Sequence, residues 1–192
     1  MQAKIVIVTG IPGVGKSTVL NELVKLAAQS GRKITVVNYG TVMLEIANKA
    51  GATLSRDEIR KSSLDFQRRL QAEAARRISQ EATKTQTLIV DTHMIVRTPS
   101  GFWPGLPNHV LSELKPELLV LIEADAEEIL ARRSHDKTRV RDKILIDEVV
   151  EELSFSRCVA SACATLTGAP VKVIRNPVGK QLEAAKELLQ LL

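Results

Sequence analysis

Aromatic residues and cysteines are scarce in this sequence. Phe, Trp and Tyr make up 3% of its 192 residues, which argues against a protein that binds single-stranded nucleic acid by stacking bases on aromatic rings. The two cysteines, Cys158 and Cys163, lie in one expected helix on different faces, too far apart for a disulfide bond. They are too few for a Cys₄ zinc site, and unpaired thiols are typical of a reducing compartment, so we expect a cytoplasmic protein without structural zinc.

Long apolar runs are absent as well. The longest runs, such as residues 118–122, are far shorter than the ~20 residues that a membrane-spanning helix needs, and we find no signal-peptide pattern. We therefore expect no membrane partner. A length of 192 residues predicts a single domain over residues 1–192, and a composition of 44% hydrophobic and 26% charged residues argues against a disordered chain. Its formal net charge of +5 attracts anions, so nucleic acid stays possible as a partner although it is not expected.

Five short runs rich in β-branched and apolar residues alternate with helical patterns. Such alternation is typical of βαβ units and predicts an α/β fold with a parallel sheet. The runs cover residues 4–9, 33–38, 87–91, 118–123 and 171–175.

The connection between the second and third runs, about residues 40–86, is longer than a crossover requires. Its helical patterns include Ser55 and Glu58 at the spacing of a capping box. We expect this segment to be a helical flap that binds a substrate; a bulky structural crossover is the alternative.

The strongest motif follows the first expected strand. Residues 10–18 read GIPGVGKST and fit G-x-x-x-x-G-K-[ST], with a strand before and a helix after. Glycines let the backbone wrap around a phosphate, and the helix N-terminus attracts the anion. The predicted nucleotide-binding residues are Gly10, Ile11, Pro12, Gly13, Val14, Gly15, Lys16, Ser17 and Thr18. We expect Lys16 to reach the β- and γ-phosphates and Ser17 to ligate Mg²⁺.

An acidic residue ends the third expected strand. Asp91 follows Leu88-Ile89-Val90, and beside a phosphate-binding loop it would act on the Mg²⁺ ion or on Ser17. His93 follows two positions later and would point to the same side. A contact of His93 with a substrate phosphate and a structural hydrogen bond both remain open.

Basic residues gather in a segment that follows the fourth expected strand and a short helix. Residues 132–142 read RRSHDKTRVRD, and we interpret them as a short lid whose arginines would neutralise phosphate charge; a solvated surface is the alternative. Arg97 precedes a Gly/Pro-rich stretch, residues 98–107, expected to be an exposed loop, and it is a candidate clamp on an acceptor phosphate.

With these residues in view, the chain resembles the archaeal-type adenylate kinases of the nucleoside monophosphate kinase group. The resemblance covers essentially the whole length. Its most specific segments are VTGIPGVGKSTVL (8–20), NYG (38–40), VDTH…RTPSG…PGLP (90–107), DKTRVRD (136–142) and LTGAPVKVI (166–174). The acidic-strand motif D-G-F-P-R of other adenylate kinases is replaced here by Asp91-Thr92-His93-Met94.

This resemblance implies a three-layer P-loop fold with a five-stranded parallel sheet in the order 2-3-1-4-5, a flap after strand two and a lid between strands four and five. It implies reversible transfer of the γ-phosphoryl group of Mg-ATP to AMP, which gives two ADP. Members of the archaeal group are oligomeric, often trimers, so a homo-oligomer is implied. The implied AMP contacts are Tyr39, Gly40, Arg60 and Arg97, and the implied lid clamp is Arg132, Arg139 and Arg141.

Two other activities are compatible with the residues. One is a kinase for another nucleoside monophosphate or a small alcohol. The other is an ATPase with an adenylate-kinase-like body that acts in RNA or ribosome assembly, which the positive charge allows.

Overall fold

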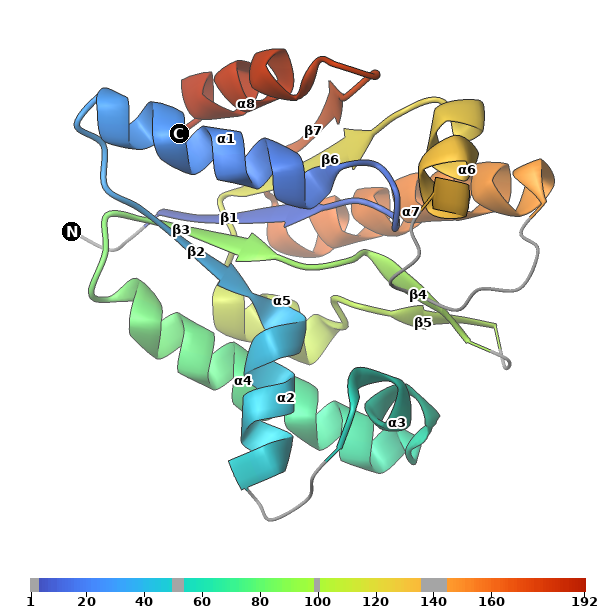
Figure 1. Cartoon of the computed structure of the whole chain (residues 1–192). Coiled ribbons are helices and arrows are strands. Elements are labelled where there is room, and N and C mark those ends of the chain that lie inside the picture. Colours follow the sequence, from blue (N-terminus) through green and yellow to red (C-terminus); the bar gives the residue numbers. More distant parts are fainter. Residues whose placement is uncertain (1–3, 50–53, 99–100, 136–144) are drawn as a thin grey trace.

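Five parallel strands form the sheet at the centre of the structure (Figure 1). The computed structural model describes residues 4–49, 54–98, 101–135 and 145–192. The sheet has the order β2-β3-β1-β6-β7, which is 2-3-1-4-5 when its strands are counted along the chain, so the expected order is confirmed. Its strands are β1 (Lys4–Thr9), β2 (Ile34–Asn38), β3 (Thr87–Asp91), β6 (Leu118–Glu123) and β7 (Val171–Arg175).

Helices cover both faces of this sheet, as Figure 1 shows, and make the expected three layers. One face packs against α1 (Lys16–Gln29) and α8 (Gln181–Gln190). The other packs against α4 (Leu64–Ala82), α5 (Asn108–Leu114) and α7 (Ile146–Thr167). Both cysteines lie in α7 as free thiols. Within the described residues, no helix is both long and apolar enough to cross a membrane.

The central strand β1 shows why the sheet is buried on both faces. Its side chains alternate between the two apolar clusters, with Ile5 and Ile7 on one side and Val6 and Val8 on the other. Successive residues of a strand point to opposite faces, so a strand covered on both sides reads as a continuous apolar run. For this reason the apolar run at residues 4–9 predicted the strand correctly.

The segment between β2 and β3 forms three helices: α2 (Tyr39–Lys49), α3 (Arg56–Lys61) and α4. The Ser55 side chain accepts from the Glu58 amide at 3.3 Å, and the Glu58 carboxylate accepts from the Ser55 amide at 2.6 Å, so the predicted capping box is confirmed. In Figure 1, α2 and α3 extend from one end of the sheet. The role of this segment as a substrate flap stays a prediction.

The stretch expected to be an exposed loop, residues 98–107, instead contains the second strand of a β-hairpin. The strands β4 (Ile95–Thr98) and β5 (Gly101–Pro104) pair antiparallel, with Val96 opposite Trp103 and Arg97 opposite Phe102. The first strand contains Ile95-Val96, which precede this stretch, and the Gly/Pro content of residues 98–107 obscured the strand propensity of Phe102-Trp103 in the second. Pro104 is tolerated because it ends a strand of a two-stranded sheet.

The expected lid begins within a helix. Residues 126–135 form α6 (Ala126–His135), which holds Arg132 and Arg133. Arg139 and Arg141 lie outside the described residues.

Truncation of a central strand side chain should unfold the protein more easily. Ile7 is fully buried, and Ile7→Ala would leave a cavity, so we expect a loss of about 2–5 kcal/mol in the free energy of unfolding. Chemical denaturation measures it. The control is Leu166→Ala on α7, whose side chain is 62% exposed and whose loss should cost less than about 0.5 kcal/mol. Equal effects of the two substitutions would contradict this account of the core.

Candidate functional site

The predicted nucleotide-binding residues form one continuous turn between β1 and α1. Gly10 to Gly15 connect the two elements, and Lys16, Ser17 and Thr18 begin the helix. Gly15 has a φ of +82°, in the left-handed region, and a Cβ atom there would approach the Asn176 Nδ2 atom to 2.5 Å. Both the backbone conformation and the close approach therefore require glycine at this position.

Side-chain donors hold the carbonyl groups of this turn. The Pro12 carbonyl accepts from Arg133 Nε at 2.7 Å, and the Val14 carbonyl accepts from Arg132 Nη1 at 3.1 Å and Asn176 Nδ2 at 2.7 Å. In the part of the chain that the structure describes, the amides of Gly13 and Gly15 donate to no protein acceptor. A turn with held carbonyls and unpaired amides is suited to bind an anion, and the N-terminus of α1 adds to its positive potential.

His93 makes a structural hydrogen bond to the same turn. Its Nδ1 atom donates to the Gly10 carbonyl at 2.7 Å, so this nitrogen carries the proton. The bond links the segment after β3 to the start of the phosphate-binding turn. It supports the structural interpretation of His93 that the sequence had left open.

Lys16 and Asp91 form an ion pair at the carboxyl ends of β1 and β3. Asp91 Oδ1 accepts from the Lys16 ammonium, and Asp91 Oδ2 accepts from Asn38 Nδ2 at 2.7 Å. Lys16 is only 8% exposed. Burial lowers the pKa of Lys16 to about 8, and the positive charge of Arg56 acts in the same direction. Asp91 thus supplies the negative charge next to this buried lysine.

Ser17 and Asp91 offer the kind of oxygen atoms that Mg²⁺ prefers. Ser17 is exposed in the first turn of α1, and Asp91 stands at the end of the neighbouring strand β3. Among the described residues no group of three or more His, Cys, Asp or Glu side chains could hold a metal ion. One hydroxyl and one carboxylate fit a Mg²⁺ ion that is bound largely through water and substrate phosphates.

A pocket that is open to solvent lies next to Asp91. It collects residues from β2 and α2, from α3 and α4, from the segment after β3, and from the hairpin. Three residues that the family resemblance implied as substrate contacts, Tyr39, Gly40 and Arg60, all line it. The complete lining is Asn38, Tyr39, Gly40, Met43, Arg56, Ile59, Arg60, Gln71, Asp91, Thr92, His93, Val96, Trp103 and Gly105.

Tyr39 fixes one wall of this pocket. Its hydroxyl donates to the Gln71 carbonyl at 2.5 Å, and the residue is 2% exposed. Burial raises the pKa of the Tyr39 phenol. The hydroxyl thus ties the start of α2 to α4.

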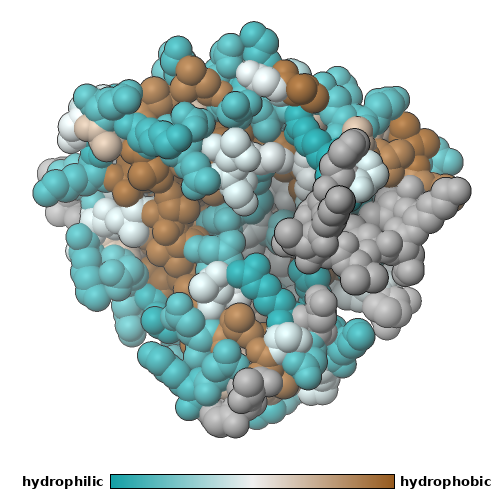
Figure 2. All heavy atoms as spheres, in the orientation of Figure 1, coloured by the Kyte–Doolittle hydropathy of each residue, from teal (hydrophilic) through white to brown (hydrophobic). Residues whose placement is uncertain are grey.

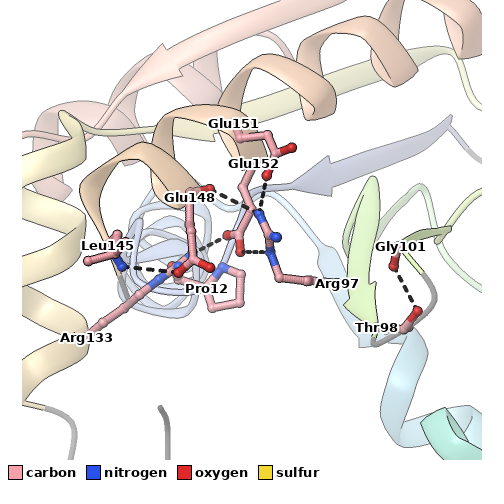
Figure 3. A network of polar contacts seen from close by, with 9 residues as sticks. All are labelled: Pro12, Arg97, Thr98, Gly101, Arg133, Leu145, Glu148, Glu151 and Glu152. Atoms are coloured by element: carbon pink, nitrogen blue, oxygen red, sulfur yellow. Dashed lines mark hydrogen bonds and ion pairs between the residues drawn. The ribbon is translucent and has the colours of Figure 1, made fainter. Parts of the chain in front are cut away.

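Arg97 points away from the pocket. In the hairpin, Val96 and its partner Trp103 line the pocket, whereas Arg97 and its partner Phe102 occupy the opposite face. Arg97 Nε donates to Glu152 Oε1 at 3.1 Å, and Nη2 donates to Glu151 Oε2 at 2.7 Å (Figure 3). The structure therefore connects Arg97 to α7 and does not bring it to the pocket.

The sequence offered no specific role for Arg133 and Asn176, although both contact the phosphate-binding turn. Asn176 directly follows β7 and is 3% exposed. Its backbone N–H donates to the backbone carbonyl of Glu123, which ends β6. Polar residues at the carboxyl ends of parallel strands are the signal that could have found it. Arg133 lay in the predicted lid without any feature that separated it from its neighbours.

Curated relatives match this chain over its full length. It is 42% identical over 192 residues to an adenylate kinase of Methanocaldococcus jannaschii, with all of both chains covered. It is 45% identical to an adenylate kinase of Saccharolobus solfataricus, covering 98% of this chain and 99% of the relative. An adenylate kinase of Methanopyrus kandleri is 46% identical, with 97% and 96% covered. The chain belongs to the adenylate kinase family.

Other comparisons agree with the fold of this adenylate kinase family member. The family model of an AAA domain matches residues 9–150. A shikimate kinase structure from Acinetobacter baumannii, in complex with shikimate, has a TM-score of 0.61 at 20% identity and covers 98% of this chain and 92% of its own. The crystal structure of TT1252 from Thermus thermophilus has the same TM-score at 16% identity, covering 100% and 98%. At these identities the likeness shows the fold alone.

A methyl group at Gly15 should weaken nucleotide binding. Gly15→Ala would place a side chain in the left-handed region and against Asn176, and we expect at least about tenfold weaker ATP binding by calorimetric titration. The control is Gly168→Ala, where φ is +73° but a Cβ atom meets nothing within 4 Å. That control should lose stability through backbone strain yet bind ATP as before. Equal ATP affinity of the two variants would contradict the assignment of the turn.

Proposed function

We propose that this chain is an ATP:AMP phosphotransferase, which reversibly transfers the γ-phosphoryl group of Mg-ATP to AMP and gives two ADP. One observation carries the proposal: the pocket beside β2, α2 and α3 ends at Asp91, and Asp91 contacts Lys16 of the phosphate-binding turn. A donor polyphosphate on the turn and an acceptor in the pocket would meet at this place. The full-length adenylate kinase relatives support the same reaction.

The chemistry requires positioning and charge neutralisation more than acid–base catalysis. The attacking phosphate oxygen of a nucleoside monophosphate is already anionic, so no strong general base is needed. The amides of the turn and Lys16 would hold the β- and γ-phosphates of the donor. Ser17 and Asp91 are the residues that would hold Mg²⁺, which withdraws charge from phosphate oxygens when it is bound.

Arginine residues would supply the remaining positive charge. Arg60 and Arg56 line the pocket, which supports a role for them in binding the acceptor. Arg132 already contacts the Val14 carbonyl of the turn. We assign Arg139 and Arg141 to the lid clamp and Arg97 to the acceptor phosphate, both from the resemblance. This role requires the Nη2 atom of Arg97 to exchange Glu151 for phosphate while its Nε atom keeps Glu152.

We also propose that the protein is a cytoplasmic homo-oligomer, with a trimer as the expected form. The strand β2 forms one edge of the sheet and is half-buried along its length. Figure 2 shows a band of hydrophobic residues across the face of the molecule that is turned to the viewer. Unpaired edge strands and exposed apolar residues are common sites of association. Light scattering of the purified protein tests this.

The decisive experiment is a coupled assay of ADP production from ATP with AMP, CMP, dTMP or shikimate as acceptor. We expect AMP to be the preferred acceptor and ATP hydrolysis without an acceptor to be slow. Preference for another acceptor would replace AMP in the proposal. Acceptor-independent hydrolysis combined with salt-sensitive RNA binding would instead favour an assembly ATPase.

Removal of the Lys16 ammonium should abolish most of the transfer. Lys16→Ala is expected to lower kcat/KM for ATP at least about 100-fold, because a charge directed at the transferred phosphate is lost. Circular dichroism should show an intact fold. The control is Lys25→Ala on the same helix, whose side chain is 66% exposed and pairs only with Glu22 among the described residues. Near-native turnover of Lys16→Ala would refute the site.

A further inference from the structure

One buried carboxylate joins two arginines that belong to different parts of the site. Glu152 lies on α7 and is 8% exposed. Its Oε1 atom accepts from Arg97 Nε at 3.1 Å, and its Oε2 atom accepts from Arg133 Nη2 at 2.6 Å. Figure 3 shows the three side chains converging between α7, the hairpin and the phosphate-binding turn.

Through Arg133, Glu152 is connected to the phosphate-binding turn. The side chain of Arg133 is 4% exposed, and its Nε atom donates to the Pro12 carbonyl at 2.7 Å. A Cβ atom at Gly13 would come within 3.0 Å of Arg133 Cγ, so the turn packs directly on this side chain. Glu152 orients the Arg133 side chain by accepting from its Nη2 atom. Arg133 in turn holds the Pro12 carbonyl and the backbone at Gly13 in place.

Through Arg97, Glu152 is connected to the hairpin that forms one wall of the pocket. Arg97 stacks over the Phe102 ring, with its guanidinium carbon 4.6 Å from the ring centroid, and Phe102 stacks on Phe155 of α7. Val96 and Trp103, on the other face of the same hairpin, line the pocket. A shift of Arg97 relative to Glu152 would consequently move that wall.

Glu151 provides the natural comparison. It also accepts from Arg97, at 2.7 Å, but its side chain is 58% exposed, and among the described residues Arg97 is its only ion-pair partner. An exposed pair of this kind contributes little energy. Of these two glutamates, Glu152 alone contacts both Arg97 of the hairpin and Arg133, which holds the phosphate-binding turn.

We propose that Glu152 is a positioning residue for phosphoryl transfer: one carboxylate sets both the phosphate-binding turn, through Arg133, and the hairpin wall of the acceptor pocket, through Arg97. This inference rests on the proposed function. A donor on the turn and an acceptor in the pocket are then aligned by the same group. The effects of Arg97 and Glu152 on turnover are therefore coupled.

The test compares Glu152→Gln, Glu151→Gln, Arg97→Ala and the double variant Arg97→Ala/Glu152→Gln. For each we would measure kcat, the KM values for ATP and AMP, and Tm. Glu152→Gln should lower kcat about tenfold or more, which is typical when the support of an active group is removed, whereas Glu151→Gln should stay within about twofold of the wild type. In the Glu152→Gln background, Arg97→Ala should lower kcat less than it does in the wild type.

A purely structural role of Glu152 gives a different result. Glu152→Gln would then lower Tm but keep kcat within twofold well below Tm, or its effect on kcat would multiply with that of Arg97→Ala. Either outcome overturns the inference. If Glu152→Gln does not fold, ATP binding by the Arg97→Gln variant tests the inference instead. Arg97 is 39% exposed, and its replacement leaves the buried pair of Arg133 and Glu152 intact. If Arg97→Gln binds ATP more weakly than the wild type when AMP is absent, the link from the hairpin to the phosphate-binding turn is supported. Unchanged ATP affinity refutes it.

Failure of the proposed function would be visible separately. A wild-type protein that does not phosphorylate AMP refutes the function. The comparison of ATP affinity between Glu152→Gln and Glu151→Gln still tests the positioning role in that case, because it needs no acceptor. Equal affinity would overturn that role.

Discussion

The site depends on a backbone turn whose carbonyl groups are held by side chains so that its amides stay unpaired. Arg133, Arg132, Asn176 and His93 donate to the carbonyls of Pro12, Val14 and Gly10. Buried backbone groups are costly when they lack partners, so each held carbonyl stabilises a conformation that α1 alone would not enforce. The remaining unpaired amides are the groups that a phosphate can satisfy. The rest of the fold can be understood as the means of delivering these four donors.

The sheet order explains how donors that are distant in sequence reach one turn. β1 is central, with β3 on one side and β6 on the other. Parallel strands bring their carboxyl ends to the same edge, where ligands of open α/β sheets bind. His93 follows β3 and Asn176 follows β7, whereas the two arginines come from α6 after β6. An order that placed β1 at an edge would leave the turn with donors from one side only.

The sequence predicted the parts of the molecule that local pattern determines. The phosphate-binding turn, the five strands and the Ser55 capping box were predicted because each is a continuous segment with its own signal. The strand order came from the resemblance and not from periodicity. The hairpin was missed because Gly and Pro dominate residues 98–107. The orientation of Arg97 could not be predicted, since its partner Glu152 lies 55 positions away and nothing near either residue indicates their contact.

A site for a polyanion must concentrate positive charge, and this raises the free energy of the ligand-free protein. Here the buried cations each have an acidic partner at hand: Lys16 has Asp91, and Arg133 shares Glu152 with Arg97. Breaking a buried pair by removing one member is strongly destabilising because the other charge stays buried. Asp91 therefore competes with phosphate for Lys16, and binding must draw Lys16 from the carboxylate towards the phosphate. Glu152, in contrast, keeps its two arginines, so the phosphate-binding turn and the hairpin stay in one fixed relation while that exchange takes place.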